Sequence, residues 1–135
     1  MRVVFDTNVV LDVLLDREPF STAATSLFCA VEESRIDALL CATTLTTIEY
    51  LLGQTMSANR VKKVLSRLLE LFDVATVNRT VIHAALQSGM RDFEDAVLAH
   101  SAHLAGADAV ITRNGRDFRH SPVKIFTPAD FLTLL

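Results

Sequence analysis

Short apolar runs alternate along the chain with longer segments in which apolar residues recur every three or four positions. The short runs are typical of buried strands, which we expect at residues 3–5, 38–42, 74–77, 109–112 and 123–126. The longer segments predict helices at residues 8–15, 19–34, 43–52, 57–72, 79–88, 92–105 and 128–135. This alternation predicts a three-layer α/β fold, in which a mainly parallel central sheet of four to five strands is flanked by helices.

Several residues are expected to mark the ends of these helices. Pro19 suits the first turn of the second helix, and Thr43 or Thr44 is expected to cap the third helix. In the helix that begins near Asp92, Asp92 fits the N-cap and Asp95 the third helical position. Its inward face is expected to consist of Phe93, Ala96, Val97 and Leu104. Asp95 would then lie beside Ala99 and Ala102, whose small side chains leave room for a ligand, while Glu94 faces solvent.

Length and composition indicate one domain that spans residues 1–135, because the chain has 135 residues and half of them are hydrophobic. The first residues predict a strand rather than a secretion signal, and no apolar run is long enough for a membrane span, so we expect a cytoplasmic protein without a membrane partner. Cys29 and Cys41 lie among apolar residues without CxxC spacing, which favours buried, reduced thiols.

The net charge of −3 argues against a broadly basic surface for nucleic acid. A bound cation or a local basic patch must therefore attract any polyanion. Arg113, Arg116 and Arg119 gather after the fourth predicted strand. Such a run is usually only a solvated face, but here it adjoins the acidic residues described next and is a candidate contact for a phosphate backbone.

Carboxylates follow the predicted strands at several places along the chain. Asp6 directly ends the first strand, Glu49 and the pair Asp92/Asp95 lie on helices, and Asp117 follows the fourth strand. The carboxyl ends of parallel strands form the ligand crevice of an open α/β sheet, so these acids can converge there. Each also has a simpler interpretation: Asp6 as an N-cap, and Glu49 as the solvated side of a helix whose neighbours are buried.

Clustered carboxylates repel one another unless some bind protons or a cation neutralises them. Oxygen ligands select hard cations such as Mg²⁺ or Mn²⁺, and a metal held in this way suits phosphodiester hydrolysis. The chain has no GxSxG, P-loop, GxGxxG or CxxC motif, which excludes the common sequence signatures of other hydrolases, NTPases, dinucleotide enzymes and zinc ribbons. His100 and His103 lack a third nitrogen or sulfur ligand at suitable spacing, so a zinc site is not expected.

Four motifs in this order resemble the PIN-domain family: Asp6-Thr7-Asn8, Thr46-Thr47-Ile48-Glu49, Asp92-Phe93-Glu94-Asp95-Ala96 and Ile111-Thr112-Arg113-Asn114-Gly115-Arg116-Asp117-Phe118. The resemblance implies a PIN-like, Rossmann-like sheet and a ribonuclease that depends on Mg²⁺ or Mn²⁺. It also implies a likeness to the VapC toxins of toxin–antitoxin pairs, with a homodimer and a separately encoded antitoxin as expected partners.

The resemblance assigns roles position by position. Asp6, Glu49 and Asp95 match metal-coordinating acids, and Asn8 and Thr112 match polar residues that orient the site. The fourth acid departs from the family pattern, because many relatives have Asp where this chain has Asn114. The nearest carboxylate here is Asp117, so the number of metal ions is left open. We therefore expect Asp117 to be one of the catalytic acids. Asn114 and Asp92 are expected to support the site.

Two functions remain open on the sequence alone. The first is a metal-dependent endoribonuclease, with the toxin of a toxin–antitoxin pair as one form of it. The second is a degenerate PIN-like domain that binds RNA or a protein. The presence of Asp6, Glu49 and Asp95 together favours the first. A receiver-type or phosphatase domain fits less well, because Asn8 stands where a DxD pair needs its second acid.

Overall fold

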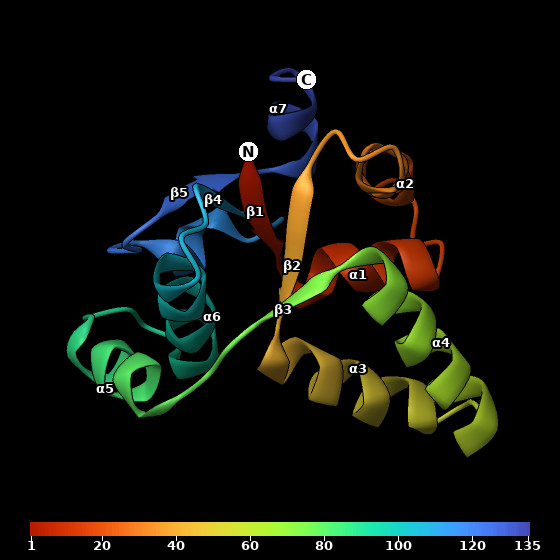
Figure 1. Ribbon diagram of the computed structural model, residues 1–135, viewed down its shortest axis with the longest axis horizontal. Helices are drawn as coiled ribbons and strands as arrows, with labels where there is room; N and C mark the ends of the chain where they lie inside the picture. Colours follow the sequence, from red (N-terminus) through yellow and green to blue (C-terminus); the bar gives the residue numbers. More distant parts are fainter.

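Five short strands pair in parallel to form one sheet in a computed structural model that describes residues 1–135 (Figure 1). The order across the sheet is β3-β2-β1-β4-β5, so β1 lies at its centre between β2 and β4. The strands are β1 Arg2–Phe5, β2 Asp37–Cys41, β3 Asp73–Ala75, β4 Ala109–Ile111 and β5 Lys124–Phe126. The predicted three-layer, parallel α/β architecture is confirmed.

Helices cover both faces of this sheet. They are α1 Thr7–Leu14, α2 Ser21–Glu32, α3 Ala42–Gly53, α4 Ala58–Leu71, α5 Arg79–Gln87, α6 Phe93–Leu104 and α7 Pro128–Leu132, with a short 3₁₀ helix, η1, at Gly115–Phe118. Figure 1 shows α5 and α6 on one side of the sheet and α1, α2 and α4 on the other. None of the helices combines the length and the hydrophobicity that a membrane span requires.

The alternation of side chains along each strand divides the core between the two faces. Val3 and Phe5 pack on the face that α1, α2 and α4 cover, whereas Val4 packs on the face that α6 covers. On the first face the ring of Phe5 lies 5.8 Å from that of Phe28 and 5.3 Å from that of Phe72, in tilted and edge-on arrangements. The central strands β1, β2 and β4 are buried on both faces, which explains why their sequences read as continuous apolar runs.

The inward face of α6 is as predicted at Ala96 and Val97, which are buried against α5, but it differs from the prediction elsewhere. Ala99 and Ala102 are fully buried against Val4 and Val110 of the sheet, whereas Phe93 and Leu104 are each about half exposed. Small side chains let α6 lie close to the strands, and this contact leaves the larger apolar residues at its ends outside. The prediction that Ala99 and Ala102 leave room for a ligand is therefore wrong, because residues of the sheet pack against them.

Three local predictions are also corrected. α3 begins at Ala42, with Cys41 as an N-cap whose side chain accepts no capping bond from a backbone N–H, so Thr43 and Thr44 lie inside the first turn. Pro19 precedes α2, which begins at Ser21. Both cysteines are free as expected, but Cys29 is exposed on α2, and only Cys41 is buried.

Candidate metal centre

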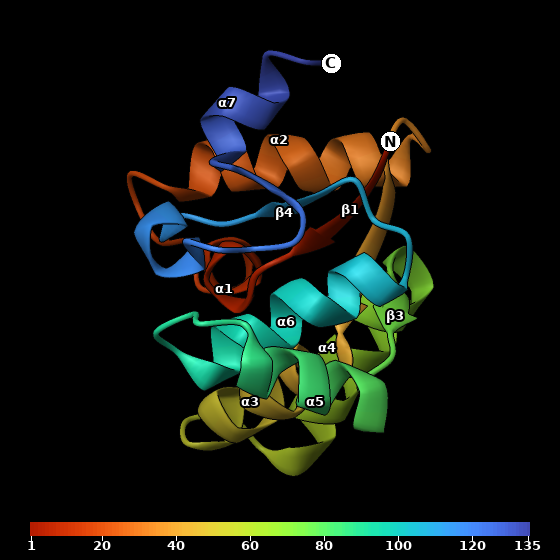
Figure 2. The same cartoon turned by 90° about the vertical axis from the view of Figure 1, so that its left-hand side faces the viewer.

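The carboxyl edge of the sheet brings together residues from three distant parts of the chain. Asp6 directly follows β1, Thr112 directly follows the neighbouring strand β4, and α6 begins on the adjoining face with Asp95 in its first turn. Figure 2 shows the starts of α1 and α6 and the turn after β4 at the same end of the sheet. The central position of β1 explains why Asp6, the residue that follows it, lies in the middle of this site.

Asp6 is nearly buried and held in a fixed orientation by hydrogen bonds. Its Oδ1 accepts from the backbone N–H of Thr7 at 2.8 Å, which makes Asp6 the N-cap of α1. Its Oδ2 accepts from the Thr112 hydroxyl at 2.7 Å and from Asn8 Nδ2 at 3.2 Å. The capping and functional interpretations of Asp6 are therefore compatible, because these neutral donors orient the carboxylate without removing its charge.

Burial raises the pKa of Asp6 despite the hydrogen bonds from Thr112 and Thr7, which act in the opposite direction, and the charges of Glu94 and Asp117 raise it further. Burial also raises the pKa of Asp95 to about 7, with added contributions from the charges of Asp6, Asp92, Asp117 and Glu94. In both groups the charges of acids that follow β1 or lie on α6 and η1 add to the effect of burial.

No positive side chain compensates this repulsion. The ion pairs of the chain are Arg2–Asp37, Arg17–Asp12, Arg35–Glu33 and Arg113–Asp12, and none of them includes an acid of this cluster. Asp117 is placed here by the turn after β4, in which its N–H donates to the Asn114 carbonyl at 3.0 Å. The cluster is therefore a concentration of negative charge that a cation would stabilise.

Glu94 is a member of the cluster that sequence reasoning does not identify. Its side chain is exposed, as predicted, but its charge acts on both Asp6 and Asp95, and its Oε1 accepts from the Thr47 hydroxyl of α3 at 3.5 Å. The signal in the sequence is the run of three acids within residues 92–95. An exposed member of such a run can still act on the site through its charge.

Glu49 is the predicted ligand that the structure does not join to the others. It is exposed on α3. The expected burial of its neighbours is confirmed for Ile48 and Leu52 but is wrong for Tyr50, which is exposed. Glu49 is not among the main charges that act on Asp6 or Asp95. Two residues along a helix correspond to about half a turn, so Glu49 points away from the side on which Thr47 meets Glu94. Its role in the site stays a prediction.

Asp92 caps α6, because its Oδ1 accepts from the backbone N–H of Asp95 at 2.9 Å. We expect Asp92→Ala to lower the free energy of unfolding by about 1 kcal/mol, the usual contribution of an N-cap. Asp92→Asn is the matched control, since asparagine caps equally well. Urea denaturation measures both, and equal losses in the two variants would contradict a capping role.

The fit of this cluster to a metal rests on its donor chemistry. No three Asp, Glu, His or Cys side chains converge closely enough to form a ready-made cage. However, Mg²⁺ keeps several waters and commonly binds through only one or two carboxylates. Asp6 and Asp95 supply hard oxygen donors with raised pKa values and no cationic partner, so the residues present suit such an ion.

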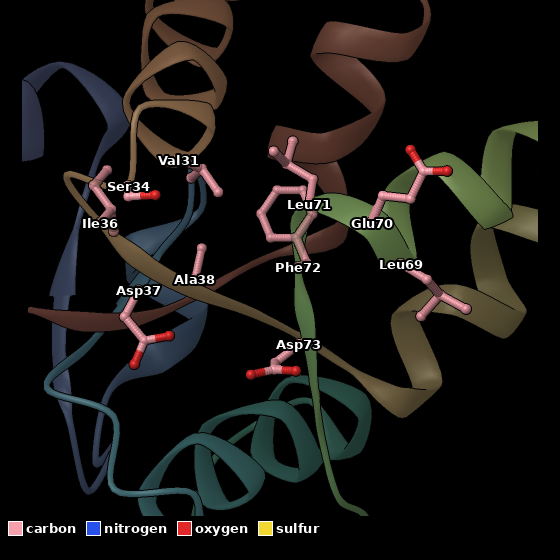
Figure 3. A pocket seen from close by; sticks show the side chains of 10 residues that line it. All are labelled: Val31, Ser34, Ile36, Asp37, Ala38, Leu69, Glu70, Leu71, Phe72 and Asp73. Atoms are coloured by element: carbon pink, nitrogen blue, oxygen red, sulfur yellow. The ribbon is translucent and has the colours of Figure 1, made fainter.

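A hollow at the opposite edge of the sheet provides a contrast. Asp37 and Asp73, which begin β2 and β3, lie beside it together with Phe72 and Leu71 (Figure 3). Asp37 is neutralised there by Arg2, whose Nε donates to Asp37 Oδ2 at 2.8 Å. The two acids lie at the amino ends of parallel strands, away from Asp6, so this hollow is separate from the candidate centre.

A parallel α/β sheet with polar residues at its carboxyl edge places this chain among the open α/β proteins, which bind ligands at that edge. The chain belongs to the PIN-domain family, because the family model described as "PIN domain" matches residues 2–116. Comparison with curated proteins gave no match.

Solved structures share this fold at low sequence identity. A chain of a toxin-antitoxin complex from Klebsiella pneumoniae is 22% identical with a TM-score of 0.71, over 93% of this chain and 97% of that one. A chain of VapBC-1 from nontypeable Haemophilus influenzae is 15% identical with a TM-score of 0.71, over 96% and 99%. A chain of VapBC2 from Rickettsia felis, bound to a DNA fragment from its promoter, is 12% identical with a TM-score of 0.70, over 94% and 98%.

Proposed function

We propose that this chain is a metal-dependent endoribonuclease that hydrolyses RNA phosphodiester bonds. The observation that carries the proposal is the uncompensated acidic cluster at the carboxyl edge of the sheet, in which the pKa of Asp95 is raised to about 7. In a PIN domain, such a cluster is best explained by a divalent cation that neutralises it. Mg²⁺ or Mn²⁺ bound there supplies an activated water and a positive charge for the phosphoryl oxygens.

The residues of the chain have separate tasks in this scheme. Asp6 and Asp95 hold the cation, with Glu49 as a further proposed ligand and Asp117 as an outer acid. Thr112 and Asn8 fix the Asp6 carboxylate through their hydrogen bonds. Because every donor to Asp6 is neutral, no positive side chain takes the place of a cation, while the orientation of the carboxylate is set before the cation binds.

The proposal is tested with purified protein and a pool of single-stranded RNA. We expect cleavage with Mg²⁺ or Mn²⁺, no cleavage in EDTA, and recovery when the metal is added back in excess. Undiminished cleavage in EDTA would reject the metal mechanism and indicate general acid–base chemistry by His or Arg side chains.

Exposed arginines beside the cluster are proposed to contact the RNA backbone. Arg116 and Arg119 lie on η1 and directly after it, and both are exposed. The double variant Arg116→Ala/Arg119→Ala should weaken RNA binding and lower the slope of log affinity against log salt by about 0.7 for each phosphate that is no longer neutralised. Fluorescence anisotropy in EDTA, which prevents cleavage, measures this slope. An unchanged slope would show that these arginines form only a solvated face.

A degenerate PIN domain that binds RNA without cleaving it is the alternative. The exposed position of Glu49 and the lack of a ready-made three-ligand group favour this alternative. The same RNA assay separates the two functions, since the degenerate domain would bind RNA equally well with or without metal and cleave it in neither case.

The partners proposed for this chain are a second copy of itself and an antitoxin. The structural relatives named above come from complexes titled as toxin-antitoxin or VapBC assemblies. This chain also has an apolar groove between α2 and α4, lined by Phe28, Val64, Leu68 and Leu71 among others, which suits the apolar face of a bound segment.

Co-expression with a small protein encoded beside this chain, followed by co-purification, tests the antitoxin. Sedimentation tests the dimer.

A further inference from the structure

A buried ion-pair cluster next to the candidate metal centre is not explained by any function assigned so far. Asp12 is fully buried on α1, five residues after the start of the helix. It accepts from Arg113 Nε at 2.6 Å, from Arg113 Nη2 at 3.2 Å and from Arg17 Nε at 2.9 Å. Asp12 therefore connects the first helix to the segment that follows β4, 101 residues away.

Stability alone is a weak explanation for this cluster. Removing charges from water is costly, and apolar residues of similar size commonly stabilise a protein as well as a buried ion pair does. What the charges add is geometry, because a guanidinium that donates two hydrogen bonds to one carboxylate is fixed in direction. The Arg113 guanidinium is held on its face as well, 3.9 Å from the centre of the Phe20 ring.

The fixed position of Arg113 is transmitted to Asp6 by a short series of hydrogen bonds. The backbone N–H of Arg113 donates to Asn8 Oδ1 at 3.3 Å, which orients the Asn8 amide. Asn8 Nδ2 then faces Asp6 Oδ2 at 3.2 Å. Thr112, the residue before Arg113, donates its hydroxyl proton to the same Oδ2 at 2.7 Å. Both side chains that orient Asp6 therefore depend on where Arg113 is held.

We infer that Asp12 and Arg113 are positioning residues of the metal centre, which set the orientation of Asp6 through Asn8 and Thr112. The inference rests on the proposed function and changes the role expected for Arg113. Two of its donors are engaged by Asp12 and only 24% of its side chain is exposed, so Arg113 orders the site while Arg116 and Arg119 remain for the RNA.

The test compares Mn²⁺ affinity, measured by electron paramagnetic resonance of free Mn²⁺, in the wild type and in variants of the cluster. Asp12→Asn and Arg113→Met should each raise the Kd for Mn²⁺ by about 10- to 100-fold, the usual effect of losing an outer partner of a metal ligand. RNA affinity in EDTA should stay at the wild-type value. In cleavage, kcat should fall while KM changes little.

Two controls separate positioning from general destabilisation. Arg17→Met removes one bond to Asp12 and a bond to the Asn8 carbonyl, which Arg17 Nη2 makes at 3.2 Å. It leaves both bonds between Asp12 and Arg113, so its Mn²⁺ affinity should fall less than that of Arg113→Met. Arg2→Met breaks the Arg2–Asp37 ion pair at the opposite edge of the sheet and should lower the melting temperature without changing Mn²⁺ affinity. Should Asp12→Asn fail to fold, Arg113→Lys keeps a positive partner for Asp12 but loses the two-bond geometry, and it should still bind Mn²⁺ more weakly.

The outcomes distinguish this inference from the proposed function. A wild-type protein that binds no Mn²⁺ would reject both. If the wild type binds Mn²⁺ and the Asp12 and Arg113 variants bind it equally well, the positioning role is wrong and the metal centre stands. Weaker RNA binding in EDTA by Arg113→Met, with Mn²⁺ affinity unchanged, would show that Arg113 contacts RNA instead.

Discussion

Replacing Asp6 with asparagine is expected to abolish RNA cleavage while the fold survives. The substitution keeps the shape of the side chain but removes the charge that lies at the centre of the acidic cluster. Loss of an outer partner commonly costs about 10- to 100-fold in metal affinity or activity, so loss of this ligand should cost more. The asparagine amide would also meet the Thr112 hydroxyl and the Asn8 amide, both of which donate to Asp6.

Cleavage rates at saturating Mg²⁺, together with circular dichroism of both proteins, measure this effect. Asp73→Asn is the matched control, because it removes one carboxylate at the opposite edge of the sheet and gives the same change in net charge. Activity in Asp6→Asn close to that of Asp73→Asn would contradict the assignment of the centre.

Asp95→Asn is expected to change how the stability of the metal-free protein depends on pH. The pKa of Asp95 is about 7 in the folded protein, against an ordinary value of 3.8. Between these values the folded state binds more protons than the unfolded state, so the free energy of unfolding falls as pH rises from about 4 to 7. Asparagine does not titrate, so the variant should have a flatter profile and higher stability at neutral pH.

The same variant should lose the stabilisation that a divalent cation gives. A ligand that binds only the folded state raises the melting temperature, and the rise should be larger at pH 8 than at about pH 5.5, where protons compete for Asp95. Asp92→Asn, which keeps the cap of α6, should retain the cation-induced shift. Parallel pH profiles for the wild type and Asp95→Asn, or a full Mg²⁺ shift in Asp95→Asn, would contradict this account of Asp95.

The fold follows from local sequence features to a large extent. Runs such as Val3–Phe5 can be recognised as strands because a parallel sheet is buried on both faces. Helix faces are harder to predict. In α6 the close contact with the sheet selects Ala99 and Ala102, whereas the hydrophobicity of Phe93 and Leu104 suggests that they pack inward. Hydrophobicity alone does not reveal how closely two elements approach.

The candidate site is predictable only in part, because its members interact across the whole chain. Asp6 and Asp95 are identifiable from their positions after a strand and at a helix start. Asp12 is not, since an acid within a short helix normally faces solvent and its partner Arg113 is distant in sequence. For the same reason, the sequence alone suggests that Arg113 has the same role as Arg116 and Arg119, because nothing in it shows that Arg113 pairs with Asp12. Spacing indicates which acids follow strands, but it does not indicate which arginine is paired.

The most direct test of the acidic centre is a crystal structure of the protein soaked in Mn²⁺, with anomalous scattering used to locate the ion. We expect an anomalous peak at the carboxyl edge of the sheet, from an ion that Asp6, Asp95 and water molecules coordinate. A peak absent from that edge at saturating Mn²⁺, or present only beside Asp37 and Asp73 at the opposite edge, would contradict it.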